Sequence, residues 1–238
     1  MKQDFFYSLH YSNLNTPSPF LYELRVDFTI HPDKVDIKYH KHFLDREQFS
    51  AEELEEEGLS TNDDSTVEAT LNKAWVNYFN ELLKHPNWSS VPEKDDLQNN
   101  NYIQLSKEGS ADQYLILDGI EYQLEEILQA QLETLEIEAP LSIFLRKNLS
   151  KTIIESELYW GFKDRLFEVR NKKSSRFFTW EEGRELLSLF YDTDLSEQQV
   201  FKKNIPEGCT CINPGDGLWY KTPSTTVWKE LLIKVLPH

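Results

Sequence analysis

The sequence predicts an α+β protein, built mainly from antiparallel hairpins that are each followed by a packing helix. Two observations support this fold class. Apolar and polar residues alternate with period two in several short segments, which is the pattern of half-buried strands. Helix-capping sequences then introduce stretches whose apolar residues recur at helical spacing. The 14 Phe, 11 Tyr and 6 Trp residues supply large side chains for a core.

The clearest element is a hairpin over residues 20–42. Both arms alternate strictly, and the connection His31-Pro32-Asp33-Lys34 has Pro and Asp where a tight turn favours them. Pairing the last apolar residue of one arm with the first of the other fixes the register. That register predicts the opposite pairs Ile30 with Val35, Phe28 with Ile37 and Asp27 with Lys38.

Three S/T-x-x-E sequences predict helix starts, at Ser50, Ser65 and Thr179. The second predicted helix extends from residue 65 to His85-Pro86, where proline ends it. Gly119 introduces a further helix, and residues 227–235 fit a terminal one.

Short strands are expected over residues 4–11, 102–105, 114–117, 141–145, 157–162, 166–170, 209–212 and 218–221. A hairpin-then-helix order therefore recurs around residues 20–58, 102–136, 157–191 and 209–236. These segments share no sequence identity, and a true repeat would show a fixed period. The generic order of an α+β protein is the simpler interpretation.

The charge is unevenly distributed. Residues 1–138 contain 28 Asp and Glu against 10 Lys and Arg, a net −18, whereas residues 139–238 contain 13 against 15, a net +2. We therefore expect an acidic α+β half, 1–138, and a near-neutral α+β half, 139–238, although the two could form one continuous domain. Pro140 lies close to this boundary.

The acidity bears on partners and location. An acidic surface repels duplex nucleic acid and attracts a basic protein, or it serves only to keep the chain soluble. No apolar run approaches the length of a membrane span, and no export signal is evident. With only Cys209 and Cys211 present, a disulfide framework is not expected. These features predict a cytoplasmic protein without a cofactor.

One candidate metal site lies on the predicted hairpin. His40 and His42 share a strand face, and the register places Glu23 opposite His42. Two imidazoles and a carboxylate match a Zn²⁺ or Fe²⁺ ligand set. Arg25, opposite His40, is an unfavourable neighbour for a cation, and a solvent-facing hairpin explains the same residues.

A basic loop is the second candidate site. Arg170, Lys172, Lys173 and Arg176 place four positive charges within seven residues, next to aromatic side chains. Such a loop can bind a partner, a phosphate or single-stranded nucleic acid by stacking, or it can simply be solvated.

No P-loop, G-x-G-x-x-G, G-x-S-x-G or H-E-x-x-H motif occurs. The leading hypothesis is therefore a non-enzymatic interaction factor, an adaptor, inhibitor or immunity-like protein that presents its acidic surface to a basic partner. The alternatives are an enzyme with a scattered, metal-assisted site, and nucleic-acid binding through residues 170–176.

Overall fold

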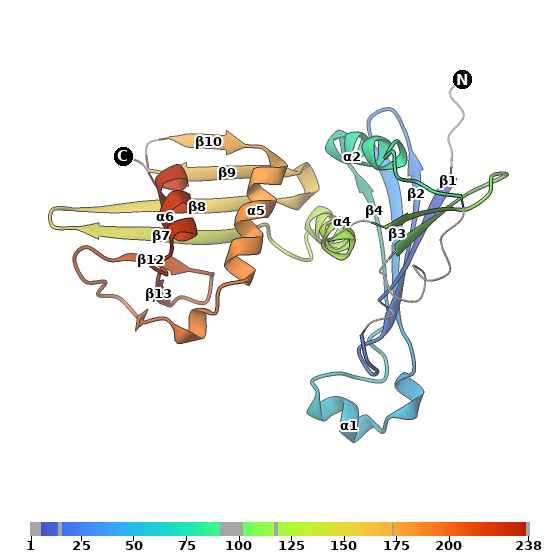
Figure 1. Ribbon diagram of the computed structural model, residues 1–238, viewed down its shortest axis with the longest axis horizontal. Helices are drawn as coiled ribbons and strands as arrows, with labels where there is room; N and C mark the ends of the chain where they lie inside the picture. Colours follow the sequence, from blue (N-terminus) through green and yellow to red (C-terminus); the bar gives the residue numbers. More distant parts are fainter. Residues whose placement is uncertain (1–5, 14–15, 91–101, 117–118, 173, 237–238) are drawn as a thin grey trace. The chain divides into compact units, whose positions relative to one another are not determined.

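The computed structural model describes residues 6–13, 16–90, 102–116, 119–172 and 174–236. The chain divides into two compact units, Met1–Glu138 and Ala139–His238. Each unit contains its own antiparallel sheet and its own helices, so the fold class is α+β, as the alternating segments predict (Figure 1).

The first unit has a six-stranded sheet in the order β4-β3-β2-β1-β5-β6. The predicted hairpin register is confirmed, because Ile30 pairs with Val35 and Asp27 with Lys38. The strands are β1 (Phe6–Ser12), β2 (Tyr22–Ile30), β3 (Val35–Phe43), β4 (Ser65–Leu71), β5 (Tyr102–Lys107) and β6 (Gln113–Ile116).

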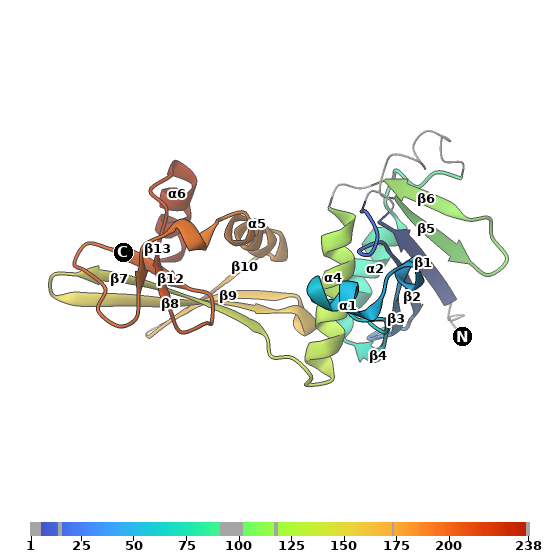
Figure 2. The ribbon, with the colours of Figure 1, turned by 90° about the horizontal axis from the view of Figure 1, so that it is seen from below.

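Two long helices of this unit, α2 (Lys73–Leu83) and α4 (Ile120–Thr134), lie on one side of the sheet (Figure 2). Phe79 of α2 stacks on Phe28 of β2 with ring centroids 4.3 Å apart. Gln131 Nε2 of α4 donates hydrogen bonds to the carbonyls of Ile37 and Val67, at 3.3 and 3.1 Å. The helices therefore cover the apolar face, and within the described part of this unit no helix lies on the opposite face, which is called the open face below.

The helix predicted from Ser65 is wrong in its first part. Residues 65–71 form strand β4, paired with β3, and the helix begins only after Asn72, whose side chain accepts a hydrogen bond from the Ala74 amide at 2.9 Å. The other two capping boxes are confirmed, at Ser50 before the short helix α1 (Ala51–Glu56) and at Thr179. The predicted strand 114–117 includes residue 117, which lies outside the described residues.

The second unit has a seven-stranded sheet in the order β10-β9-β8-β7-β12-β13-β11. Its helices are α5 (Trp180–Tyr191) and α6 (Thr226–Val235). The strands are β7 (Leu141–Leu149), β8 (Thr152–Gly161), β9 (Leu166–Asn171), β10 (Ser175–Phe178), β11 (Val200–Phe201), β12 (Thr210–Asn213) and β13 (Trp219–Lys221).

Both helices of the second unit pack on the face of the sheet that carries Trp160. The Trp160 indole donates to the carbonyl of Gly183 on α5 at 2.9 Å. Phe190 of α5 contacts both Trp160 and Trp228 of α6, with ring centroids 6.2 and 5.2 Å away. This unit therefore also has one helix-covered face and one open face.

The two units have the same connectivity. In each unit, four strands that pair in chain order, β1–β4 or β7–β10, precede a long helix, α2 or α5. Two further strands, β5 and β6 or β12 and β13, then add to the free side of the first strand, and a second long helix, α4 or α6, follows. The second unit has one extra strand, β11, and the first has one extra short helix, α1. The recurring segments of the sequence correspond to these modules only in part, because the helix of segment 20–58 is α1, which has no counterpart in the second unit, whereas the helix of segment 157–191 is α5, the counterpart of α2.

One connection differs strongly between the modules. Residues 44–64 join β3 to β4 and include α1, whereas only residues 172–174 join the equivalent strands β9 and β10. Within the first unit, α2 lies near one end of the strands, and α1 lies beyond their other end (Figure 1).

Among the described helices, none combines the length and the apolar character that crossing a bilayer requires.

Candidate functional site

The open face of the first sheet carries a row of basic side chains. His10 of β1 pairs with Arg25 of β2, which pairs in turn with His40 of β3. Because neighbouring strands lie about 5 Å apart, this row places one imidazole on each side of the Arg25 guanidinium. Ser12, Glu23 and His42 form the adjacent row.

A concavity of about 520 Å³ lies over these two rows. Its volume falls in the range typical of small-molecule sites. Besides the two rows, it is lined by Tyr11 of β1, Leu24 of β2, and Tyr102 and Gln104 of β5. Sequence analysis identified His40, His42 and Glu23 but missed His10, because nothing in the sequence shows that β1 pairs with β2.

Each of the three histidines uses one ring nitrogen within the unit. His42 Nδ1 donates to Asp64 Oδ2 at 2.6 Å, and His40 Nδ1 lies 3.0 Å from the Thr66 hydroxyl in a hydrogen bond. Ser8 donates its single hydroxyl hydrogen to Asp27 at 2.6 Å, so its oxygen accepts from His10 Nε2 at 3.1 Å. Burial, together with the Arg25 charge, lowers the pKa of His10.

The predicted metal ligands are therefore on one face, with Glu23 opposite His42 as expected. The carboxylate that His42 contacts is Asp64 rather than Glu23. Within the described part of the chain, no group of three or more His, Cys, Asp or Glu side chains is arranged to hold a metal ion. The described geometry thus gives the metal hypothesis no further support.

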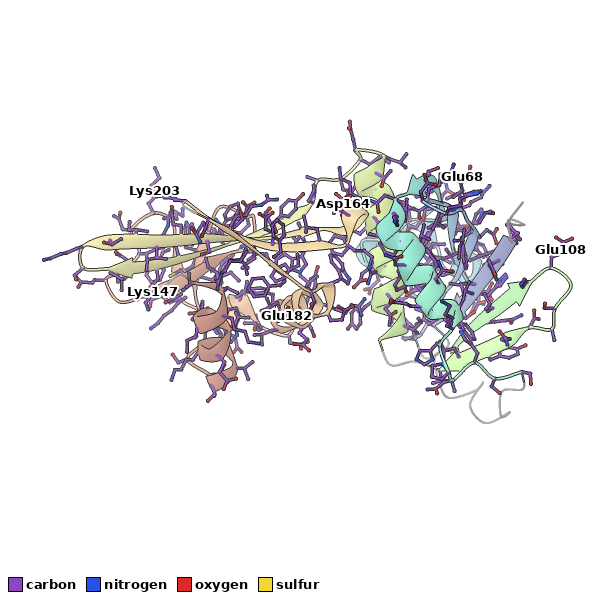
Figure 3. The ribbon with its side chains drawn as sticks, turned by 90° about the horizontal axis from the view of Figure 1, so that it is seen from above. Glu68, Glu108, Lys147, Asp164, Glu182 and Lys203 are labelled. Carbon is purple, nitrogen blue, oxygen red and sulfur yellow. The ribbon has the colours of Figure 1, made fainter. Side chains whose placement is uncertain are left out.

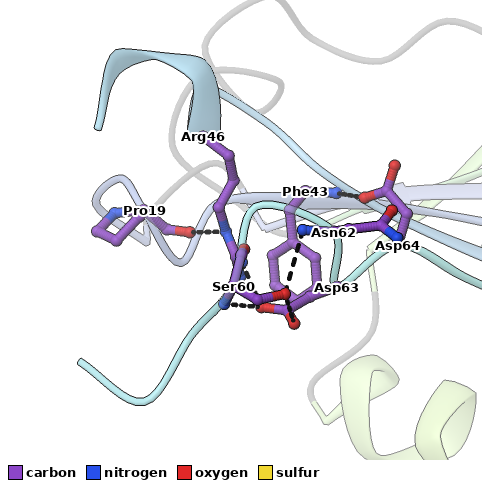
Figure 4. A network of polar contacts seen from close by, with 7 residues as sticks. All are labelled: Pro19, Phe43, Arg46, Ser60, Asn62, Asp63 and Asp64. Carbon is purple, nitrogen blue, oxygen red and sulfur yellow. Dashed lines mark hydrogen bonds and ion pairs between the residues drawn. The ribbon is translucent and has the colours of Figure 1, made fainter. Parts of the chain in front are cut away.

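The connection 44–64 is anchored by a polar network around Arg46 (Figure 4). Arg46 Nε donates to the Pro19 carbonyl at 3.0 Å, and Nη1 donates to the Ser60 carbonyl and to the Asp63 carboxylate. The guanidinium lies over the Phe43 ring, 4.0 Å from its centroid. These contacts join both ends of the connection to the loop before β2.

Only Leu54 of α1 is buried, so this helix contributes little to the core. Six glutamates of the connection are exposed, namely Glu47, Glu52, Glu53, Glu55, Glu56 and Glu57. Within the described residues, none of the six forms an ion pair with a basic side chain. The acidic segment 44–64 is thus a fixed, solvent-facing concentration of negative charge.

Two charges of the basic loop in the second unit are paired with carboxylates of its own sheet. Arg170 pairs with Glu168 at 2.8 Å and stacks on Tyr159 at 3.5 Å, and Lys172 pairs with Glu155 at 3.2 Å. Arg176 Nη2 donates to the carbonyl of Lys234 at 2.6 Å. Lys173, the fourth predicted residue, lies outside the described residues.

A smaller concavity of about 290 Å³ lies on the open face of the second sheet, beside this loop. Arg146 lines it, stacks on Trp219 at 4.1 Å and pairs with Glu155 at 2.6 Å. Its charges are thus paired with one another. Cys209 and Cys211 are both reduced, and burial raises the pKa of the Cys211 thiol to about 11. That thiol is therefore protonated and unreactive at neutral pH.

Comparison with known proteins gives no match to this chain, whether with protein-family models, with curated proteins or with solved structures.

Proposed function

We propose that this protein is a non-enzymatic interaction factor, of the adaptor, inhibitor or immunity type, whose acidic segment 44–64 binds a basic partner. The observation that carries the proposal is the difference between the two modules. Three residues, 172–174, connect the third and fourth strands of the second unit, whereas 21 residues connect the equivalent strands of the first. The fold itself therefore does not require the acidic segment.

The charges of the segment support binding rather than stabilisation. Six exposed glutamates lie within eleven residues, Glu47 to Glu57, and they repel one another. Repulsion among like charges costs stability unless an external cation compensates it. A basic protein surface does so, and the surrounding negative charge of residues 1–138 speeds its association.

The anchoring of the segment also supports recognition. Arg46 is 94% buried, since only 6% of its surface is exposed, and it fixes residues on both sides of α1. A segment held in one conformation loses little entropy on binding, which favours affinity. A purely solubilising acidic tract needs no such anchor.

The test neutralises the charge without disturbing the helix cap. Glu52, Glu55, Glu56 and Glu57 are replaced by Gln, leaving the capping pair of Ser50 and Glu53 intact. The matched control replaces four exposed glutamates of the second unit by Gln, and so changes the net charge by the same amount as the α1 variant. These are Glu185, Glu197, Glu207 and Glu230.

The measurement is affinity capture from the native lysate at low and at high salt, with the captured proteins identified by mass spectrometry. We expect a basic protein that binds the parent and control proteins at low salt and is lost at high salt, because exposed charges are screened beyond about 8 Å at 0.15 M salt. The α1 variant should lose it. Equal capture by the α1 variant and the control would contradict the proposal.

A further inference from the structure

The concavity on the open face of the first sheet is separate from the acidic segment, since no residue of 44–64 lines it. Arg25 is the central residue. Its Nε donates to Asp27 at 2.9 Å, and the side chain is 51% exposed. The described residues place no acceptor on its two Nη groups, which are the pair of donors that bind oxyanions in a bidentate manner.

The residues around Arg25 add further hydrogen-bonding groups. His10 and His40 flank it in the row, and each has one ring nitrogen that the contacts with Ser8 and Thr66 leave unused. Fixing one imidazole nitrogen through a neighbour orients the other toward a ligand. Gln104 and Ser12 lie at the edge of the same concavity.

We propose that this concavity binds the phosphate group of a small phosphorylated molecule, with Arg25 holding two of its oxygens. His40 donates from Nε2 to a third oxygen while the Thr66 hydroxyl donates to its Nδ1, and His10 Nδ1 accepts from a protonated phosphate oxygen. Phosphate matches the site because it offers several oxygens around one centre, one of which can carry a proton, and the row offers a planar fork between a donor and an acceptor. Tyr102, which lines the concavity from β5, provides an aromatic surface for the remainder of the ligand.

With the histidines neutral, the charged side chains that line the concavity are Arg25 and Glu23, and their formal charges cancel. Specific binding therefore has to come from the arrangement of the Arg25 fork and its neighbours rather than from net charge.

The experiment follows the imidazole resonances of the whole protein, labelled at histidine, during a titration with inorganic phosphate at one fixed pH. We expect the resonances of His10, His40 and His42 to shift along one saturable binding curve. His31 and His85 lie outside the concavity and serve as internal references. Shifts of His31 and His85 as large as those of the three concavity histidines would contradict a specific site.

Variants of Arg25 separate a designed site from general attraction. Arg25→Ala should weaken phosphate binding by about tenfold or more, and Arg25→Lys by less, because lysine keeps the charge but not the fork. Lys34→Ala removes one positive charge from the same unit outside the concavity and should have no effect. Binding that survives Arg25→Ala unchanged would overturn the proposal, and the tryptophan indole resonances report whether each variant is folded.

A second titration identifies the source of the phosphate. Tighter binding of adenosine monophosphate than of inorganic phosphate, lost in Tyr102→Ala, would identify a phosphorylated aromatic molecule as the ligand. Equal affinities would identify the phosphate group alone as the recognised chemistry.

Discussion

Arg46 is the residue on which the acidic segment depends. Its side chain is 7% exposed and is surrounded by the Pro19 and Ser60 carbonyls, the Asp63 carboxylate and the Phe43 ring. Burial of a guanidinium is costly unless its donors find acceptors; Nε and Nη1 of Arg46 find them, whereas Nη2 has no hydrogen-bond partner within the described residues. Asp63 is the one charged acceptor in this group, so the pair should govern how the segment responds to acid.

The Asp63 carboxylate accepts from Arg46 and from Ser60, and these hydrogen bonds lower its pKa from an ordinary 3.8 to about 2. Because the folded pKa lies below the unfolded one, Asp63 stabilises the protein above about pH 4, and this contribution is lost as the pH falls toward 2. Asp63→Asn should therefore lower the free energy of unfolding by about 1–2 kcal/mol at pH 6, a range reduced for partial exposure.

Urea unfolding at pH 6, 4 and 3 tests this expectation. The difference between the parent and Asp63→Asn should narrow below pH 4. Asp33→Asn, which removes an exposed carboxylate in the turn between β2 and β3, is the matched control and should show no such trend. A constant difference across this pH range would mean that Asp63 is not the titrating partner of Arg46.

At the scale of single elements, β4 shows where sequence patterns are ambiguous. Val67 and Leu71 are four residues apart, a spacing that places two side chains on one face of a helix and equally on one face of a strand. The β-branched residues Thr66, Val67 and Thr70 favour a strand, and pairing with β3 decides the outcome. A four-residue capping signature does not outweigh a ladder of seven paired residues.

The position of the true helix start can be tested by substitution. Asn72→Ala removes the side chain that caps α2 and should lower the free energy of unfolding by about 1 kcal/mol, whereas Asn72→Ser should largely preserve it. Ser65→Ala alters only the first residue of β4 and should change stability by less than about 0.5 kcal/mol. Urea unfolding of the three variants is the measurement, and a larger effect of Ser65→Ala would place the helix start at residue 65 after all.

Local signals predicted a good part of the elements. The 20–42 hairpin was predictable with its register, because strict alternation and a short turn leave one pairing that buries all apolar residues. The row of His10, Arg25 and His40 was only half predictable, since Arg25 and His40 belong to that hairpin and His10 does not. Arg46 gave no signal, because burial of a lone arginine depends on carbonyls 14 and 27 residues away.

At the scale of the whole molecule, the repeated connectivity was visible in the sequence only as a recurring order of elements. Equivalent strands of the two modules share an alternation of apolar and polar residues rather than identities. Such a pattern specifies which face is buried but not which side chain lies there. The equivalent strand pairs β1–β2 and β7–β8 therefore carry different side chains on their open faces: His10 and Arg25 in the first unit, and Arg146 and Glu155 in the second.

We propose that the two units unfold independently of one another, and Gly183 offers a local way to test this proposal. A Cβ atom at Gly183 would lie 2.7 Å from Cβ and Cγ of Phe167, which is fully buried and stacked on Trp160 at 4.8 Å. Phe167 therefore cannot move aside. Gly183→Ala should destabilise by about 1–2 kcal/mol, since overpacking costs about 1–3 kcal/mol and helix propensity returns up to about 1 kcal/mol.

Hydrogen exchange of the whole protein then measures how far this destabilisation spreads. If residues 1–138 and 139–238 unfold independently, as we propose, Gly183→Ala should speed exchange about tenfold in the most protected amides of β7, β8, β9 and β12, and leave β1, β2 and β3 unchanged. Glu185→Ala, at an exposed position of the same helix, is the control and should alter neither set. Faster exchange in both sheets would instead show that the two units unfold as one cooperative block and would overturn this proposal.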